Sequence, residues 1–396
     1  MEFERDEELI SFAQDLIRCR SYSGEEDGVV KILSEKFKEA GAEVYVDRYG
    51  SIIASVEGNR PGPVILFDGH IDTVPVPDPS AWSYDPFGGE IADGKLFGRG
   101  TSDMKGADAA MTIAILRYVQ KHGRDFAGKI CFAGVVHEEC FEGVASREIS
   151  KLVKPDYVVI GEASEMNLKI GQRGRAEIKV ETYGKSAHSS NPEKGINAVY
   201  KMVRLIDRLR AVPVPEYPGL AKGNMELTDI VSVPYPGASV LPSLCSVTYD
   251  RRLLPGETKE SVLRPVLDII GQLEEEDPDF KAKAYFTAGE ERCYTGERIA
   301  DTRFFPGWKY DESEPYVQKV KKRLDEIGIR PRLTAYNFCT NGSHYAGEAG
   351  IRTMGFGPSR EDLAHTVDEY VEIDQLVAAM HGYVGIMEAL LEEENR

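Results

Sequence analysis

The first part of the chain alternates between helical and extended patterns of apolar residues. Leu9, Phe12 and Leu16 share one face of a predicted helix, because they are spaced by three and four residues. Further helices are expected over 27–40, 107–122 and 143–151, and strands over 43–47, 52–57, 63–67, 129–136 and 157–160. Strands that alternate with helices predict an α/β fold, in which helices cover both faces of a mixed sheet.

The pattern changes in the middle of the chain. Strands are expected over 176–183, 227–233, 243–253 and 281–288, and helices over 196–209 and 259–275. That order, β-α-β-β-α-β, is the ferredoxin-like arrangement and makes a complete small domain. The α/β pattern then resumes with a helix at 315–327, a strand at 352–356 and a helix at 374–392. We therefore expect one domain built from 1–175 and 291–396, interrupted by an inserted domain over 176–290.

Composition excludes some classes of partner and indicates a cellular compartment. The chain has 48 Lys and Arg residues against 66 Asp and Glu residues, a formal net charge of −18. This acidity argues against nucleic acid or an anionic membrane surface as a partner, because both are polyanions. The first eight residues lack the apolar core of a signal peptide, and no apolar run approaches the roughly 18 residues that span a bilayer. The six scattered cysteines have no C-x-x-C pair, which predicts reduced thiols in a soluble, cytoplasmic protein.

Acidic residues and histidines follow the apolar strands of the predicted sheet. Segment 64–67 leads into His70, and segment 130–136 leads into Glu138 and Glu139. Segment 157–160 leads into Glu162, and segment 353–356 leads into His365. Ligands of open α/β sheets bind outside the carboxyl ends of the strands, so we expect these side chains to converge. Asp103 lies on the glycine-rich turn 98–106, which can bring it to the same edge.

Two histidines with three or four carboxylates make a ligand set for a hydrolytic metal site. If Asp103, Glu139 and Glu162 bind as anions, they contribute a charge of −3 against the +4 of two divalent ions. A hydroxide would balance the remaining charge of +1. Imidazole and carboxylate without thiolate favour zinc, with cobalt or manganese as alternatives. The carboxylate left over from the pair 138–139 can act as the general base. Each residue alone has an ordinary explanation as a turn or cap residue, so the prediction depends on all six together.

Two sequence motifs of the chain are specific enough to indicate a protein family. They are Gly-His-Ile-Asp-Thr-Val-Pro at 69–75 and Ala-His-Thr-Val-Asp-Glu at 364–369. With them the chain resembles the zinc aminoacylase/carboxypeptidase group of metallopeptidases, which includes succinyl-diaminopimelate desuccinylase and acetylornithine deacetylase. The resemblance extends over essentially the whole chain and includes the inserted domain, which in the family is a lid and dimerisation domain.

The resemblance implies a role for each residue of the predicted site. His70 and Glu162 would hold one metal ion, Glu139 and His365 would hold the other, and Asp103 would bridge both. The metal ions would activate the water that attacks the substrate.

The same resemblance assigns roles around the metal ions. Asp72 would orient the neighbouring metal-binding histidine, Glu138 would be the general base, and the peptide bond Asp103–Met104 would be cis. His188, in the inserted domain, matches a family histidine that reaches the partner's active site in a dimer and stabilises the oxyanion. Arg252 matches the family's candidate for binding a substrate carboxylate, a role that suits a guanidinium group. Dimer packing for His188 and an ion pair within the inserted domain for Arg252 are the structural alternatives.

The chain departs from the desuccinylases in the segments expected near the substrate. Ser239 stands where many relatives carry a substrate-binding asparagine, and the loop 339–344 replaces an Asp-Gly-Arg-like ending. In this loop Asn341 and His344 are expected to bind substrate, although a structural role for His344 is equally compatible with its position. Together with the segment 357–365, the loop is most similar to a subgroup named selenium-metabolism hydrolases, a label that specifies no substrate.

These observations predict a homodimeric di-zinc amidohydrolase of the metallopeptidase or deacylase type. The expected substrate is a small molecule that bears a carboxylate next to the amide: an N-acyl or N-carbamoyl amino acid, or a dipeptide. The alternative is a catalytically silent, metal-containing binding or assembly subunit of the same fold. Retention of Glu138, which a silent subunit does not need, argues against this alternative.

Overall fold

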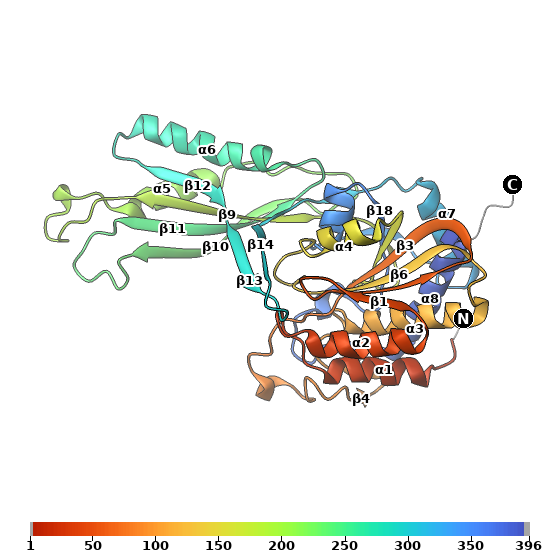
Figure 1. The fold of residues 1–396 in the computed structure, drawn as a ribbon. Coiled ribbons are helices and arrows are strands. Elements are labelled where there is room, and N and C mark those ends of the chain that lie inside the picture. Colours follow the sequence, from red (N-terminus) through yellow and green to blue (C-terminus); the bar gives the residue numbers. More distant parts are fainter. Residues whose placement is uncertain (1–2, 392–396) are drawn as a thin grey trace. The chain divides into compact units, whose positions relative to one another are not determined.

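The computed structural model describes residues 3–391, which form two compact units (Figure 1). Within the described residues, unit 1 contains the chain up to Gln172, the segment Glu290–Asp301 and the chain from Lys309 on. Unit 2 contains Arg173–Gly289 and Thr302–Trp308. The expected domains, 1–175 with 291–396 and 176–290, stay a prediction, since compactness alone does not test whether each part folds as a domain.

Unit 1 is built on a mixed sheet in the order β1-β2-β6-β3-β7-β18-β8, with β17 also paired to β8. These strands are β1 (Glu43–Val46), β2 (Ile52–Glu57), β3 (Arg60–His70), β6 (Ala127–Val135), β7 (Tyr157–Ile160), β8 (Leu168–Gln172), β17 (Leu333–Tyr336) and β18 (Arg352–Gly355). The four neighbours β6, β3, β7 and β18 run parallel to one another. Their carboxyl ends therefore lie at one edge of the sheet.

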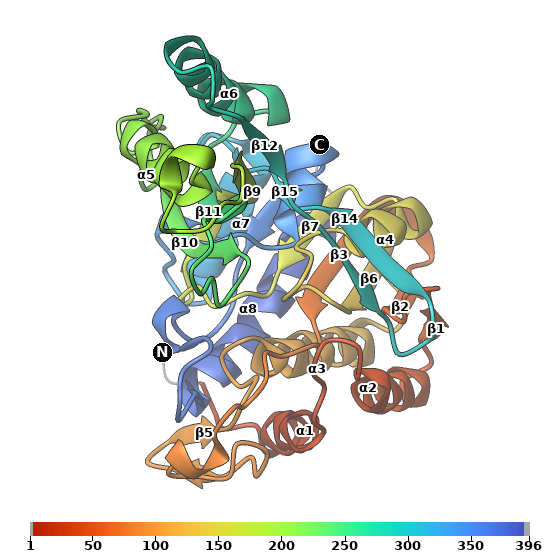
Figure 2. The same ribbon diagram turned by 90° about the vertical axis from the view of Figure 1, so that its left-hand side faces the viewer.

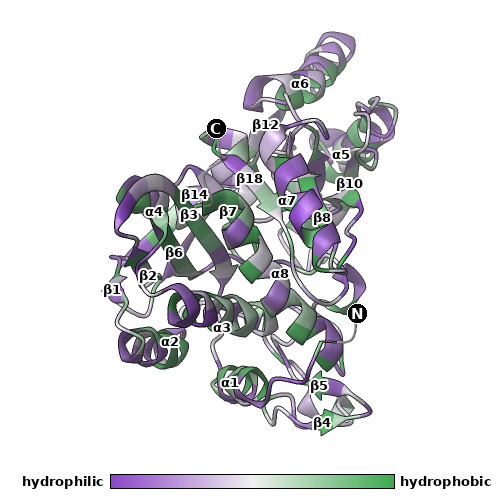
Figure 3. Cartoon of the chain, turned by 90° about the vertical axis from the view of Figure 1, so that its right-hand side faces the viewer, coloured by the Kyte–Doolittle hydropathy of each residue, from purple (hydrophilic) through white to green (hydrophobic). Residues whose placement is uncertain are grey.

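The parallel strands are apolar because the sheet is covered on both faces. Ile65, Leu66 and Phe67 of β3 are fully buried, and so are Val158 and Val159 of β7. Such doubly covered strands have continuous apolar runs in place of the alternation of a half-exposed strand. Figure 3 shows β3, β6 and β7 as hydrophobic.

Helices lie on both sides of this sheet, as the sequence predicts. They are α1 (Glu7–Arg18), α2 (Asp27–Glu39), α3 (Lys105–His122), α4 (Ser146–Val153), α7 (Pro315–Glu326) and α8 (Ile373–Leu391). Helices α3 and α8 pack against each other and against β3 and β6, and α1 packs on α3. Helix α4 lies on the opposite side of the sheet from α3 (Figures 1 and 2). None of the helices within residues 3–391 is long and apolar enough to cross a membrane.

Unit 2 has the predicted order β-α-β-β-α-β. Its elements are β9 (Gly174–Tyr183), α5 (Ala198–Leu209), β10 (Asn224–Val233), β11 (Leu244–Leu253), α6 (Lys259–Glu276) and β12 (Ala282–Phe286). The strands form an antiparallel sheet in the order β10-β11-β9-β12, and β15 (Phe304–Phe305) also pairs with β9. Alternate residues of β9, such as Ile178 and Val180, are buried against Met202 and Leu205 of α5. One face of the sheet thus carries the core of unit 2.

Short elements complete the chain. The strands β19 (Tyr370–Glu372), β5 (Lys95–Phe97) and β4 (Ile91–Ala92) form a small sheet in that order. The remaining elements are β13 (Ala288–Arg292), β14 (Arg298–Thr302), β16 (Trp308–Lys309), the 3₁₀ turns Pro79–Ala81, Pro192–Lys194 and Glu361–Leu363, and a π-helical turn at Ser343–Glu348.

Two predicted elements need correction. The expected strand over 281–288 is divided, because β12 ends at Phe286 and β13 begins at Ala288. Between them the Thr287 N–H donates to the carbonyl of Glu177, and the Thr287 carbonyl accepts from Arg303. The expected helix over 143–151 begins three residues later, because Gly143 has a φ of 86°, outside the helical region.

Candidate metal centre

Six side chains meet at the carboxyl edge of the parallel strands. They are His70 at the end of β3, Asp103 before α3, Glu138 and Glu139 after β6, Glu162 after β7, and His365 after β18. His70 Nε2 lies 2.8 Å from Asp103 Oδ1 and 3.6 Å from Glu162 Oε1. His365 Nε2 lies 3.0 Å from both Asp103 Oδ2 and Glu139 Oε2. The two oxygens of Asp103 therefore face two different groups of side chains.

The donor set fits divalent cations. Two overlapping groups have ligand atoms within 4.8 Å of one another: His70 with Glu138 and Glu162, and His70 with Asp103 and Glu139. The Oε1 atoms of Glu138 and Glu139 are buried and have no hydrogen-bond partner in the part of the chain that the structure describes. A buried, unpaired carboxylate oxygen costs several kcal/mol. A cation at the cluster would remove that cost.

The electrostatics of the cluster also suit a bound cation. Burial raises the pKa of Glu138, Glu139 and Glu162, and the neighbouring carboxylates raise it further. Hydrogen bonds to Asp103 and Glu139 raise the pKa of His365 to about 10. These pKa directions show that the cluster favours added positive charge, which divalent ions can supply.

Asp72 connects His70 to both glutamates after β6. It is fully buried, and its backbone carbonyl lies 2.9 Å from His70 Nδ1, closer than its own carboxylate at 3.7 Å. Its carboxylate accepts hydrogen bonds from the N–H groups of Glu138, at 3.0 Å, and Glu139, at 3.2 Å. The Ser23 hydroxyl donates to the same carboxylate at 2.7 Å. Asp72 thus holds the backbone of the predicted base as well as the histidine.

The turn before α3 has the backbone that the resemblance predicts. The peptide bond Asp103–Met104 is cis. This confirms the expectation for the peptide bond after Asp103.

Asn341 lies in the core of unit 1. It is 2% exposed, and its amide group donates to Asp68 Oδ1 and accepts from the Gly143 N–H, both at 2.9 Å. The Tyr345 hydroxyl donates to the other oxygen of Asp68. The pKa of Asp68 is raised to about 6 by burial, against the effect of these two donors. Asn341 thus connects two loops to the strand that carries His70, and its predicted contact with substrate stays a prediction.

His344 has partners at both ring nitrogens. Nε2 lies 2.8 Å from the Ser150 hydroxyl oxygen, and Nδ1 lies 2.8 Å from Glu348 Oε2. These bonds match the structural alternative stated for His344, and its substrate contact stays a prediction.

The two predicted site residues of unit 2 have local partners. His188 is exposed, and its Nδ1 accepts from the Ser190 N–H at 3.1 Å and lies 2.7 Å from the Ser190 hydroxyl oxygen. Arg252 Nε forms an ion pair with Asp250 Oδ1 at 3.0 Å. The oxyanion role of His188 and the carboxylate role of Arg252 stay predictions.

Sequence reasoning missed residues that hold the clustered side chains in place. Ser23 bonds Asp72, Asp68 anchors the loop of Asn341, and the Tyr336 hydroxyl donates to the carbonyl of Glu162 at 3.0 Å. Only Asp68 stands beside a motif, one residue before the segment 69–75.

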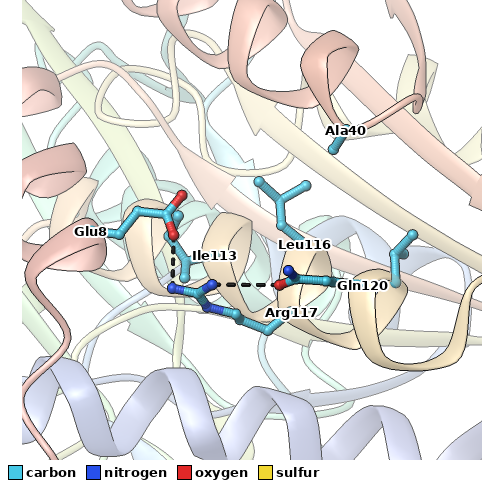
Figure 4. Close-up of a pocket in the computed structure, with 7 residues that line it drawn as sticks. Glu8, Ala40, Ile113, Leu116, Arg117 and Gln120 are labelled. Atoms are coloured by element: carbon cyan, nitrogen blue, oxygen red, sulfur yellow. Dashed lines mark hydrogen bonds and ion pairs between the residues drawn. The ribbon is translucent and has the colours of Figure 1, made fainter.

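A surface pocket elsewhere in unit 1 does not belong to this cluster (Figure 4). Its lining residues are Glu8, Ala40, Ile113, Leu116, Arg117, Val119 and Gln120. The Arg117 guanidinium pairs with Glu8 across it, at 2.7 Å. Since none of the six clustered side chains lines this pocket, we assign it no part in the chemistry.

Comparison with known proteins identifies related sequences and a structure of the same fold. Residues 66–389 match Peptidase family M20/M25/M40. The uncharacterized protein YgeY of Escherichia coli strain K12 is 29% identical over 389 residues, which cover 96% of this chain and 93% of the relative. A succinyl-diaminopimelate desuccinylase of Methylorubrum populi is 32% identical, over 65% of this chain and 70% of the relative. The crystal structure of aminopeptidase PepT from Bacillus cereus has the same fold, with a TM-score of 0.76, 21% identity, and coverage of 97% of this chain and 98% of that chain.

Proposed function

We propose that the chain uses two zinc ions to cleave a small amide next to a carboxylate. The chain belongs to Peptidase family M20/M25/M40 and is therefore a metal-dependent hydrolase of amide bonds. The observation that carries this proposal is Asp103, whose two oxygens lie 2.8 Å from His70 and 3.0 Å from His365. A carboxylate with one oxygen toward each of two ligand groups suits a pair of metal ions.

Five residues would hold the two ions. His70 and Glu162 would bind one, Glu139 and His365 would bind the other, and Asp103 would contact both. Imidazole and carboxylate ligands favour zinc, with cobalt and manganese as alternatives. When bound, the two ions would polarise the substrate carbonyl and lower the pKa of water at the site.

Glu138 would move the proton. Its buried carboxylate lies within the cluster, and Oε1 has no hydrogen-bond partner within residues 3–391. It can therefore accept the proton of the attacking water and deliver it to the leaving nitrogen. Burial, together with the neighbouring carboxylates, raises its pKa and makes it a stronger base toward water. The bond from the Glu138 N–H to Asp72 fixes the backbone from which this carboxylate projects.

A second copy of the chain would complete the active site. Strand β10 forms an outer edge of the sheet of unit 2, and it exposes apolar side chains, with Ile230 at 52% and Val231 at 51%. On α5, Tyr200 is 74% exposed. An exposed apolar edge strand readily pairs with another chain. These features support a homodimer in which unit 2 acts as lid and dimerisation domain, and His188 stabilises the oxyanion at the partner's site.

The proposed substrates are N-acyl amino acids, N-carbamoyl amino acids and dipeptides. Arg252, in unit 2, would bind the substrate carboxylate after exchanging its ion pair with Asp250. The desuccinylase among the relatives supports an acylated amine as substrate, whereas Ser239 and the loop 339–344 argue for a different acyl or amine group. A cytoplasmic location and a place in the selenium-metabolism subgroup stay predictions.

A release assay over a substrate panel tests this proposal. The purified protein would be incubated with N-acyl, N-carbamoyl and dipeptidyl amino acids, each with added zinc, cobalt or manganese. We expect at least one class to be hydrolysed, with the matched amide that lacks the carboxylate cleaved at least about tenfold more slowly, because one charge-assisted contact is worth about 1.5–3 kcal/mol. Equal cleavage of both amides would contradict the carboxylate requirement, and no hydrolysis of any class would favour the silent subunit.

Mixed dimers test whether His188 acts on the partner's site. We expect His188→Ala and Glu138→Ala each to be inactive as homodimers. After unfolding and refolding together, mixed dimers would contain one site with both an intact base and an intact histidine, and activity would return to about one quarter of wild type. Ser190→Ala, which removes only the neighbour of the histidine, is the matched control. A mixture as inactive as the separate variants would contradict catalysis across the dimer.

A further inference from the structure

Glu369 binds the turn that carries Asp103. The carboxylate is fully buried, and its Oε1 accepts hydrogen bonds from three backbone N–H groups: Gly100 at 3.0 Å, Ser102 at 2.9 Å and Asp103 at 3.1 Å. Its Oε2 accepts from Arg99 Nη1 at 2.5 Å. One side chain therefore satisfies four donors of a single turn, and one of these donors is the backbone N–H of Asp103 itself.

The same residue belongs to the segment that carries His365. It stands four residues after His365 and directly before β19, which pairs with β5. Its backbone carbonyl accepts from the Gly98 N–H at 2.9 Å, where the turn begins. The two backbones thus pair as far as Gly98 and Glu369. The Glu369 side chain continues the contact with the residues of the turn that follow Gly98.

Other hydrogen bonds of the turn use different donors: the Arg99 N–H, the Thr101 N–H and hydroxyl, and the Ser102 hydroxyl. Gly100 has a φ of 90°, in the left-handed region, so the backbone reverses there and its N–H groups point inward. Buried N–H groups need an acceptor, and among the described contacts of Gly100, Ser102 and Asp103 it is Glu369 that provides one. Without this carboxylate the turn would have to move to find other acceptors, and Asp103 would move with it.

We propose that Glu369 is the positioning residue that sets Asp103 between the two metal subsites, at the 3.0 Å separation from His365. The inference rests on the proposed metal centre and adds a residue that touches neither metal nor substrate. It acts through the backbone of Asp103, so its loss should change how both ions are bound before it changes how substrate is bound.

Metal binding by Glu369→Gln tests the proposal. In this variant the amide oxygen can still accept from the three backbone N–H groups. The NH₂ group faces Arg99, and because both are donors this bond is lost and the turn is held less tightly. We expect zinc affinity, measured by calorimetry, to fall about 10- to 100-fold, the range typical of residues that orient metal ligands. We also expect the visible absorption spectrum of the cobalt-loaded protein to shift, and kcat to fall with little change in KM.

Glu388→Gln is the matched control. Glu388 is also a buried glutamate of unit 1 with two cationic partners, Arg323 and Lys121, but it touches no residue of the cluster. If Glu388→Gln weakens zinc binding as much as Glu369→Gln does, general destabilisation explains the result and the positioning role is overturned. The positioning role is also overturned if Glu369→Gln binds zinc with wild-type affinity and its cobalt-loaded form has the wild-type absorption spectrum.

Two further outcomes are distinguishable. If Glu369→Gln fails to fold, Glu369→Asp decides, because it keeps the charge but withdraws the carboxylate by one methylene; wild-type metal affinity in that variant overturns the inference. If the wild-type protein itself binds no divalent ion, the proposed metal centre fails rather than the role of Glu369.

Discussion

Glu138→Gln should lower kcat by about 10²- to 10⁴-fold, the usual contribution of a general acid–base residue. The amide is nearly isosteric with the carboxylate and cannot take a proton from water. Since the five predicted metal ligands are unchanged, metal content should stay at the wild-type level. Steady-state kinetics on the best substrate of the panel, with metal analysis of the same sample, checks both statements.

Glu142→Gln separates this effect from a general change in charge. Glu142 is a buried glutamate four residues further on, and its charge raises the pKa of Glu138. It lies outside both groups of ligand atoms, so its replacement should change kcat by less than about fivefold. Normal turnover in Glu138→Gln would exclude Glu138 as the base, and an equal loss in both variants would point to the local charge instead.

Removal of the metal ions should abolish activity and also destabilise the protein. Without cations, Asp103, Glu139 and Glu162 are crowded, buried acids, and the pKa of Glu139 and of Glu162 is raised by burial and by the Asp103 charge. An ion present at 100 times its Kd stabilises the folded state by about 2.7 kcal/mol. Dialysis against a chelator should therefore lower Tm by about 10 °C, for two ions in a unit of this size.

Readdition of zinc, cobalt or manganese should restore both activity and Tm. The control is the same dialysis with chelator already saturated by zinc, which cannot remove zinc from the site. Activity that survives complete removal of transition metals would contradict a metal-dependent mechanism. A Tm that does not respond to chelation would place the ions elsewhere than in this buried cluster.

The sequence predicted that these side chains cluster because strand ends obey a geometric rule. His70 ends β3, Glu138 and Glu139 follow β6, and Glu162 follows β7. Parallel neighbours must bring their carboxyl ends to one edge. The apolar runs of these strands are long enough to be seen in a single sequence. The convergence of these side chains could therefore be predicted without knowledge of side-chain packing.

The residues that support the ligands could not be predicted in this way. Glu369, Ser23 and Asn341 act through hydrogen bonds to backbone groups or to a buried carboxylate, and such bonds leave no periodicity in the sequence. Strand β8 was also missed, because Lys169 and Gln172 interrupt its apolar run. Both are buried and satisfied by tertiary partners, Glu361 for the lysine and Thr340 for the glutamine.

The most direct test of the two-metal centre is the number of divalent ions per chain, measured by mass spectrometry on the purified protein. The geometry around Asp103 predicts two transition-metal ions per chain in the wild type. In Asp103→Ala, which removes the residue that faces both ligand groups, it predicts a large loss of both ions, with the Glu142→Gln variant retaining two. An active wild-type protein with fewer than one ion per chain, or an Asp103→Ala variant that still holds two, would contradict the proposed centre.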